Sequence, residues 1–339
     1  MDTRIVYATS HDGVRVACSV RASSFPLIYL HVPLFSNCRS LGSTESSVRF
    51  KERLMKRGQL IMVDLRGSGL ADRHPPSQTF EDCMADLEAI YAALKIERAD
   101  ILAFGARGSM AIRFAWKNPE RVRRLFIWGT SSGPTPADGV PMASPGFRYL
   151  VANDWPLFLQ TFVARNAISE KAVPALLTDI ERNSDQEDVL AFLDCLRETN
   201  IEGEAALLRC PTLVAELDAT TLRDAGHAPR LAAMIPNSEL VYLPNKALFG
   251  WTEELADAIE RFDAMLDAAE RTRGVDASLS PRELEVLQKL VAGETNAGIS
   301  EALAISRSTV DRHVANIYAK AGVHNRAEVV RWALTHSLV

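Results

Sequence analysis

Short apolar segments recur along the first 271 residues, each four to six residues long and bounded by polar or turn-forming residues. None shows the two-residue alternation of a strand with one face in water, so we expect strands that are covered on both faces. The segments are residues 26–30, 59–63, 101–104, 125–128, 211–215 and 240–243. Amphipathic stretches lie between them, and this alternation of strand and helix predicts an α/β fold with a doubly wound, mostly parallel sheet.

The alternation stops over residues 134–207, which contain proline- and glycine-rich turns followed by helical stretches. An all-helical insertion late in an α/β sheet predicts a cap over the carboxyl ends of the strands, where such sheets bind ligands. A helix is also expected over residues 79–94, because Thr79 and Asp82 form a pattern close to a capping box.

The domain boundary is predicted from a change in pattern after the last helix of this region, residues 253–271. Residues 272–278 are short, polar and aperiodic, which is typical of a linker. We therefore expect a large domain over residues 1–271 and a small one over residues 279–339.

The small domain has the pattern of four helices. Ser280, Pro281 and Glu283 supply a cap, a first-turn proline and the acid of a capping box. A short second helix, a tight turn at Ala304 and Ile305, and a longer third helix follow. Together they predict a small all-α helix-turn-helix domain whose third helix lies in the major groove of DNA.

The third helix has a polar face opposite its apolar stripe, and its N-terminal hydroxyl groups suit a phosphate. Its last turn adds a lysine that we also expect to contact DNA. The candidate DNA-binding residues are Ser306, Ser308, Thr309, Asp311, Arg312, Ala315, Asn316 and Lys320.

The tail resembles the LuxR-type helix-turn-helix over its whole length. The similarity rests on the Pro281-Arg282-Glu283 opening, Gly293, the Asn296-x-x-Ile299 pair, the run from Ser306 to His313, and the Gly322-Val323 turn. The resemblance implies that the residues at positions 311, 312 and 315 face bases and that the fourth helix forms the dimer contact.

One departure from that family is the acid at position 311, where many members have lysine. Asp311 repels phosphate but can accept a hydrogen bond from cytosine N4, so it favours specificity at a cost in affinity. A four-helix interaction module that never contacts DNA is the alternative.

The large domain resembles the α/β-hydrolase family. The resemblance rests on residues 63–69, 102–109 and 118–125, which follow in that family's order and spacing. It implies a nucleophile elbow of the form G-x-S-x-G, an acid after the apolar segment at residues 211–215, and a histidine after the apolar segment at residues 240–243.

The catalytic triad is predicted to be missing. On the expected register the three positions hold Arg107, Thr220 and Leu248, and a guanidinium has no lone pair with which to attack an ester. Ser109 and His31 are the possible replacements, but neither is expected to lie where a base meets a nucleophile. We therefore expect no catalytic residues.

A ligand pocket beneath the cap is the remaining hypothesis for this domain. Arg107 at a helix N-terminus suits a carboxylate or sulfonate, so we expect a small, partly apolar anion as effector. The alternative is an internal salt bridge from Arg107 to Asp218 or Glu216, which leaves an apolar pocket. The candidate ligand-binding residues are Arg107, His31, Phe104, Trp155, Phe158, Asp218, Leu248 and Phe249, each of which also fits a packing role.

Charge and cysteine content narrow the class of protein. The net charge is −5, yet the segment from Leu279 onward has seven Lys and Arg against six Asp and Glu, so one copy is expected to bind DNA weakly and a homodimer is favoured. Five scattered cysteines without a CxxC pair indicate reduced thiols in a cytoplasmic protein, and no metal or cofactor is expected. No apolar run approaches the roughly 20 residues of a membrane span.

These observations predict a DNA-binding transcription regulator whose non-enzymatic hydrolase-like domain binds a small-molecule effector. Two alternatives remain. One is an active hydrolase with non-standard catalytic residues that also binds DNA, and the other is a constitutive DNA-binding scaffold whose large domain only dimerises.

Overall fold

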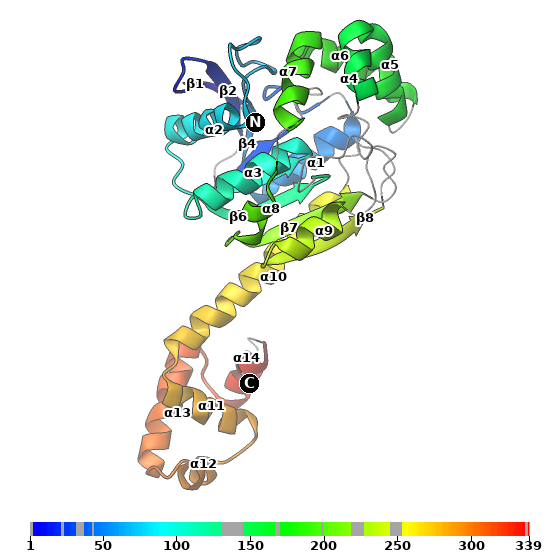
Figure 1. Ribbon diagram of the computed structural model, residues 1–339. Coiled ribbons are helices and arrows are strands. Elements are labelled where there is room, and N and C mark those ends of the chain that lie inside the picture. Colours follow the sequence, from blue (N-terminus) through cyan, green and yellow to red (C-terminus); the bar gives the residue numbers. More distant parts are fainter. Residues whose placement is uncertain are drawn as a thin grey trace. The chain divides into compact units, whose positions relative to one another are not determined.

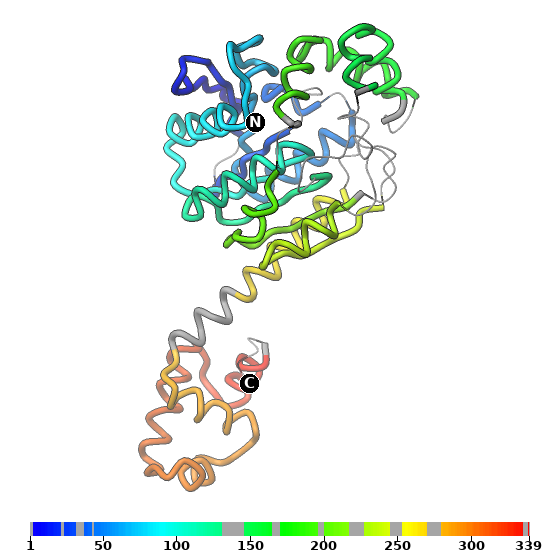
Figure 2. Tube along the Cα trace, in the orientation of Figure 1, coloured from blue at the N-terminus to red at the C-terminus, as the bar shows by residue number. Residues whose placement is uncertain are grey.

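The computed structural model describes residues 3–21, 24–31, 37–42, 44–130, 145–166, 170–197, 200–217, 227–244, 253–335 and 338. Figure 2 traces the course of the chain. The chain divides into two compact units, Met1–Ile259 and Glu260–Val339. Each unit has its own apolar core.

The first unit is built on an 8-stranded sheet of order β1-β2-β4-β3-β5-β6-β7-β8 (Figure 1). β2 is antiparallel to both β1 and β4, and the neighbours from β4 to β8 are parallel. The predicted mostly parallel α/β sheet is therefore confirmed. The strands are β1 (Arg4–Thr9), β2 (Arg15–Arg21), β3 (Pro26–Leu30), β4 (Gln59–Asp64), β5 (Ala99–Phe104), β6 (Val122–Trp128), β7 (Thr212–Leu217) and β8 (Ser238–Leu243).

Helices cover both faces of this sheet. Alternate residues of β3 show the division, because Ile28 joins the core formed with α2 and α3, whereas Tyr29 packs edge-on against Phe50 of α1 with ring centroids 6.4 Å apart. The start of α10 lies on the α1 side, where Arg53 pairs with Asp257 at 2.7 Å. The helices are α1 (Glu45–Arg57), α2 (Phe80–Leu94), α3 (Ala106–Lys117), α8 (Glu202–Ala206), α9 (His227–Met234) and α10 (Glu253–Ser278).

The described residues between β6 and α8 form only helices, as the sequence pattern predicts. They group together in Figure 1. They contact the segments that follow β4 and β5, since Asn183 O accepts from Gly69 N at 3.0 Å and the Phe192 ring lies 5.4 Å from the Arg107 guanidinium. This insertion therefore meets the carboxyl ends of those two strands. Its elements are α4 (Pro145–Asn153), α5 (Trp155–Asn166), the 3-10 helix η2 (Glu170–Ala172), α6 (Val173–Asn183) and α7 (Gln186–Arg197).

The expected end of the last long helix is wrong. α10 continues through Ser278 rather than ending at Arg271, so residues 272–278, predicted to be an irregular linker, are helical. Gly274 did not stop the helix, because a single glycine costs only about 1 kcal/mol in a helix interior.

The second unit contains four further helices around one apolar core, as predicted. They are α11 (Pro281–Val291), α12 (Asn296–Ala302), α13 (Arg307–Ala321) and α14 (Arg326–Thr335). The capping box between Ser280 and Glu283 is present. Val286, Ile299 and Val310 are fully buried and bring α11, α12 and α13 together.

A helix that crosses a lipid bilayer needs about 20 predominantly apolar residues. Among the described residues, no helix combines the length and the apolar character that crossing a membrane demands.

Candidate functional sites

The sharp turn from β5 into α3 lies at Gly105. Its φ of 60° and ψ of −130° place it outside the helical region, and the helix starts at Ala106. A nucleophile elbow is the residue on this strained turn between strand and helix. The expected register, which put Arg107 there, is therefore wrong by two residues, because Arg107 already belongs to the first turn of α3.

Gly105 offers no side chain to react at this turn. Thr130 donates from its hydroxyl to the Gly105 carbonyl oxygen at 2.9 Å, which ties the turn to the end of β6. A Cβ at Gly108 would overlap the Thr130 hydroxyl, so α3 needs glycine there to approach so closely. The strained turn of a nucleophile elbow is therefore present at Gly105, but it carries no nucleophilic side chain.

Arg107 is buried with 4% of its surface exposed. Its guanidinium lies over the Phe192 ring of α7 and near the sulfur of Met110 at 3.9 Å. Among the residues that the structure describes, no carboxylate lies within salt-bridge distance of Arg107. Glu216, one of its two expected partners, instead accepts from the backbone nitrogen of Ala228 at 3.1 Å.

His31 serves the protein's own framework. Its Nε2 lies 2.9 Å from Asp64 Oδ1, and both side chains are almost fully buried. Asp64 also accepts from the backbone nitrogens of Cys38 at 2.8 Å and Leu70 at 2.9 Å. The pair joins the segments after β3 and β4, so His31 is held away from any role as a general base for Ser109, which is itself buried.

The other predicted pocket residues fall into separate groups. Phe104 packs against Trp128 with centroids 4.8 Å apart. Trp155 and Phe158 stack on one another within α5, with ring centroids 5.2 Å apart. The remaining candidates lie outside the described residues: Asp218, Thr220, Leu248 and Phe249.

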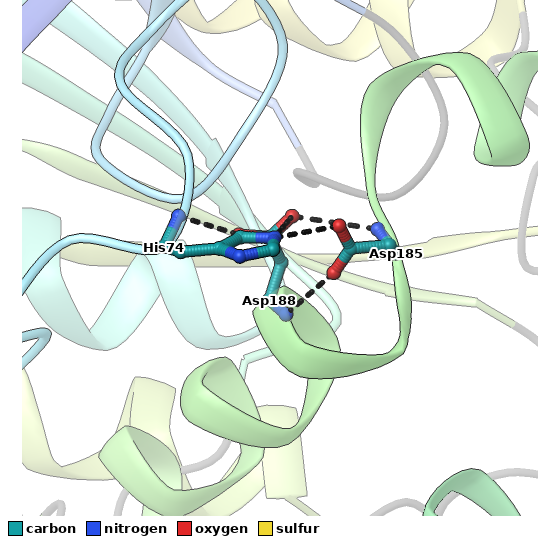
Figure 3. Close-up of side chains that lie close together, drawn as sticks. All are labelled: His74, Asp185 and Asp188. Atoms are coloured by element: carbon teal, nitrogen blue, oxygen red, sulfur yellow. Dashed lines mark hydrogen bonds and ion pairs between the residues drawn. The ribbon is translucent and has the colours of Figure 1, made fainter.

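Sequence reasoning missed a polar cluster that joins the segment after β4 to the start of α7. Figure 3 shows His74 Nε2 pointing at Asp185, with Oδ2 at 2.6 Å, and Asp188 beside them. Arg73 pairs with both carboxylates, and Asp185 Oδ1 accepts from the backbone nitrogen of Asp188 at 3.1 Å as a helix cap. The bond to Asp185 raises the pKa of His74.

These residues resemble a metal-ligand set, but Arg73 already supplies the positive charge that a cation would bring. The cluster is therefore a polar clamp on α7. A signal for it exists in the sequence only as the Arg73-His74 pair in a loop, which by itself points to no partner.

The second site is the surface of α12 and α13. Ala304, with φ of 51°, makes the tight turn between the helices, as predicted. Ser306 caps α13 by accepting from the Thr309 nitrogen at 3.2 Å. Its hydroxyl lies 2.9 Å from that of Ser308 and 2.7 Å from that of Thr309. Three hydroxyl groups therefore gather at this helix N-terminus, where free N–H groups favour an anion.

The predicted base-facing residues lie on one exposed face of α13. Ser308, Asp311, Arg312, Ala315 and Asn316 are all exposed. Asn296 of α12 donates to Asp311 Oδ1 at 2.7 Å, which orients the carboxylate.

Lys320, the last predicted DNA contact, has a partner within the domain. Its Nζ lies 2.7 Å from Glu283 Oε2 on α11, so it anchors α13 to its own core. Burial acts to raise the pKa of Glu283, but the hydrogen bonds from Lys320 and from Ser280 outweigh it and lower the pKa to about 2.

Comparison with known proteins identifies the helical domain. Residues 277–333 match the luxR family of bacterial regulatory proteins. The transcriptional regulatory protein MctR of Rhizobium johnstonii is 34% identical over 100 residues, which are 26% of this chain and 46% of that protein.

The first unit has relatives of another kind. The 2-hydroxymuconate semialdehyde hydrolase of a Pseudomonas species is 29% identical over 125 residues, which are 35% of this chain and 41% of that protein. This chain thus spans less than half the length of either curated relative.

A solved hydrolase from Pseudomonas aeruginosa superposes with a TM-score of 0.65 at 20% identity, covering 76% of this chain and 98% of that one. Identity at that level carries the fold and no activity. Residues 277–333 therefore form a LuxR-type helix-turn-helix domain, and the unit that precedes it has the α/β-hydrolase fold.

Proposed function

We propose that this protein is a transcription regulator that binds double-stranded DNA as a homodimer through α13. One observation carries the proposal: α12, the turn at Ala304 and α13 present an exposed polar face within a domain of the luxR family. In helix-turn-helix proteins the second helix of the motif enters the major groove. In a bacterial cell this function places the protein in the cytoplasm.

The chemistry of the exposed face supports reading of bases. The Arg312 guanidinium matches the two acceptors of guanine, and the Asp311 carboxylate accepts from cytosine N4. The domain has only one more basic than acidic residue from Leu279 onward, seven against six. Phosphate attraction from one copy is therefore small, which favours two copies acting together.

Binding to DNA is tested by selecting duplexes from a random library and measuring affinity by fluorescence anisotropy. Arg312→Ala should weaken binding to the selected duplex by about ten-fold or more, because a bidentate contact to guanine contributes roughly 1–3 kcal/mol of discrimination. Arg230→Ala is the matched control, since it removes an equal charge from an exposed helix of the other unit. Equal binding of selected and scrambled duplexes by the unaltered protein would count against the proposal.

We further propose that the hydrolase-fold unit binds a small anionic effector without cleaving it. Support comes from the turn at Gly105, which lacks a nucleophile, and from the buried Arg107, which meets no carboxylate among the described residues. A buried cation without a carboxylate favours an anionic guest.

A thermal-shift screen of small carboxylates tests effector binding. A true effector at a hundred times its Kd should stabilise the protein by about 2.7 kcal/mol. Arg107→Met should remove that stabilisation if Arg107 holds the anion. Turnover of esters or lactones by the same preparation would instead support the hydrolase alternative.

A further inference from the structure

A single polar contact joins α12 to α13 beside their shared apolar core. Asn296, in the first turn of α12, donates from its side-chain Nδ2 to Asp311 Oδ1 on α13 at 2.7 Å. Ile299 follows one turn later on α12, Val310 directly precedes Asp311, and both are fully buried in the core of the second unit. The contact therefore lies where the packing between the two helices ends and the exposed face of α13 begins.

The turn between the two helices is restrained by hydrogen bonds on both of its sides. Ser300 Oγ donates to the carbonyl oxygen of Ile305 at 2.5 Å. Arg282 of α11 donates to the carbonyl oxygen of Leu303 at 2.6 Å. Because these bonds and the shared core fix α12 against α13, the half-buried Asn296 is held at a constant place beside the exposed face of α13.

The partner of Asp311 is an uncharged amide. Among the residues that the structure describes, no lysine, arginine or histidine forms an ion pair with Asp311, not even Arg307, which is exposed one turn earlier on the same helix. A carboxylate has two acceptor oxygens, and Asn296 binds only Oδ1. The charge of Asp311 is therefore not neutralised, and its Oδ2 can accept a hydrogen bond from another molecule.

Arg312 lies next to Asp311 and is exposed on the same face of α13. Within the described part of the chain, its guanidinium forms no ion pair either. An internal pair between the acid and a nearby arginine would use up both groups. By holding the carboxylate through an uncharged donor, Asn296 leaves the acid and the neighbouring cations available for base edges and phosphates.

We propose that Asn296 is a positioning residue that orients the Asp311 carboxylate to accept from cytosine N4, and so sets a preference for one C·G base pair. This role rests on the proposed function, the binding of DNA by α13, and adds a base that the protein reads. Asn296 acts before DNA arrives, because a side chain that is already oriented loses less freedom on binding.

Orientation decides which base the carboxylate accepts. In the major groove cytosine presents the N4 donor, whereas guanine and thymine present acceptors, which repel a carboxylate. Adenine has an amino donor too, but its N7 acceptor lies directly beside it. A carboxylate that rotates freely can avoid that acceptor, and one that is held through Oδ1 cannot. The bond from Asn296 should therefore sharpen the preference for cytosine.

The test measures the affinity of the full-length protein for the selected duplex and for each single base-pair substitution of it. The unaltered protein should prefer C·G at one position of each half-site by about ten-fold, and Asp311→Ala should lose that preference. Asn296→Ala should lower the same preference by about three- to ten-fold, the range expected when one more side chain must be immobilised on binding. Preferences at other positions should stay as they are.

A double substitution separates positioning from a general structural role. Adding Asn296→Ala to Asp311→Ala should change no base preference further, because the residue that Asn296 holds is already gone. Gln288→Ala, which removes an exposed amide from α11, is the matched control and should change no preference. Equal weakening at every base pair by Asn296→Ala, or an unchanged preference for C·G, would contradict the positioning role alone. Equal binding of all duplexes by the unaltered protein would contradict the proposed function as well.

Asp311→Asn gives a second test in which Asn296 is left intact. The new side-chain oxygen can still accept from Asn296, and an amide NH2 then takes the place of the open carboxylate oxygen. The preference at that position should move away from cytosine, which presents only a donor, toward a base that presents an acceptor. A preference that stays with cytosine would overturn the assignment of Asp311 as the acceptor.

Discussion

Helices α3 and α13 each begin at the candidate site of their unit. The two helix starts differ in the residue that precedes the helix and in the exposure of the side chains that follow. α3 follows Gly105, a turn without a side chain, and Arg107 in its first turn is buried. α13 follows Ser306, whose hydroxyl lies beside two others, and its next exposed residues include Asp311 and Arg312. One helix start keeps the geometry of a site without its reactive group, and the other keeps its polar groups at the surface.

The difference shows which features of each helix start the packing of its unit requires. The turn at Gly105 still requires a positive φ, because the sheet and the packing of α3 against Thr130 impose it. Catalysis needs an added nucleophile and base, and these contribute nothing to that packing. The packing of the second unit, in contrast, does not fix the surface of α13. Its exposed side chains contribute little to stability and are available for DNA.

Among the predicted changes, the largest should be the loss of domain stability when Glu283, the partner of Lys320 on α13, is protonated. The pKa of Glu283 is lowered from 4.5 to about 2, so its bonds to Lys320 and Ser280 stabilise the domain fully above pH 4.5, and this stabilisation is lost as the pH falls through 2. The difference corresponds to about 3 kcal/mol. Amide hydrogen exchange of α11 and α13 over this pH range measures it. Glu283→Gln should remove most of the dependence, and the exposed Glu285→Gln should leave it in place.

The second-largest effect is expected from a substitution at Gly105, in the turn before α3. Gly105→Ser places a side chain on a turn with φ of 60°, which should lower the free energy of unfolding by about 1–3 kcal/mol. We also expect no gain of ester hydrolysis, because His31 is held by Asp64. Urea unfolding and an ester assay check both outcomes. Gly203→Ser, in an open position of α8, is the control, and new esterase activity in Gly105→Ser would break the comparison.

Replacing Asp311 on α13 should raise the affinity for scrambled duplexes and lower the discrimination in favour of the selected duplex. Asp311→Ala removes a charge that repels phosphate, so affinity for scrambled duplexes should rise. Discrimination in favour of the selected duplex should fall by about ten-fold, since one base contact is lost. Anisotropy titrations with both duplexes measure the ratio. An unchanged ratio would mean that Asp311 serves only its bond to Asn296.

The cap of α13 should give the smallest change. Ser306→Ala removes the acceptor for the Thr309 nitrogen, and loss of such a cap costs about 1 kcal/mol. Hydrogen exchange in the first turn of α13 reports this loss. Ser308→Ala removes a neighbouring hydroxyl that does not cap the backbone, so it should leave exchange there unchanged.

Local patterns predicted the elements well because their signals are short in range. The capping boxes at Thr79 with Asp82 and at Ser280 with Glu283 are both present, since each is decided within four residues. The turn at Ala304 follows from the same kind of pattern. The end of α10 was misplaced because helix ends without a strong stop signal depend on a balance of small terms.

Site assignments that depend on distant partners were less successful. The position of the elbow was two residues off, because the sequence motif does not state which residue takes the positive φ. Lys320 stays a predicted DNA contact, but the sequence did not reveal its partner Glu283, which lies 37 residues away on another helix.

The amino-acid sequence by itself determined the two kinds of domain, because apolar periodicity, caps and a long helix-turn-helix pattern are local properties of the chain. Only the tertiary structure decided that Gly105 occupies the sharp turn and that Arg107 is buried over the Phe192 ring. The physical reason is that burial and pairing depend on which distant segments the core brings together, and a side chain's chemistry changes with the partners it meets there.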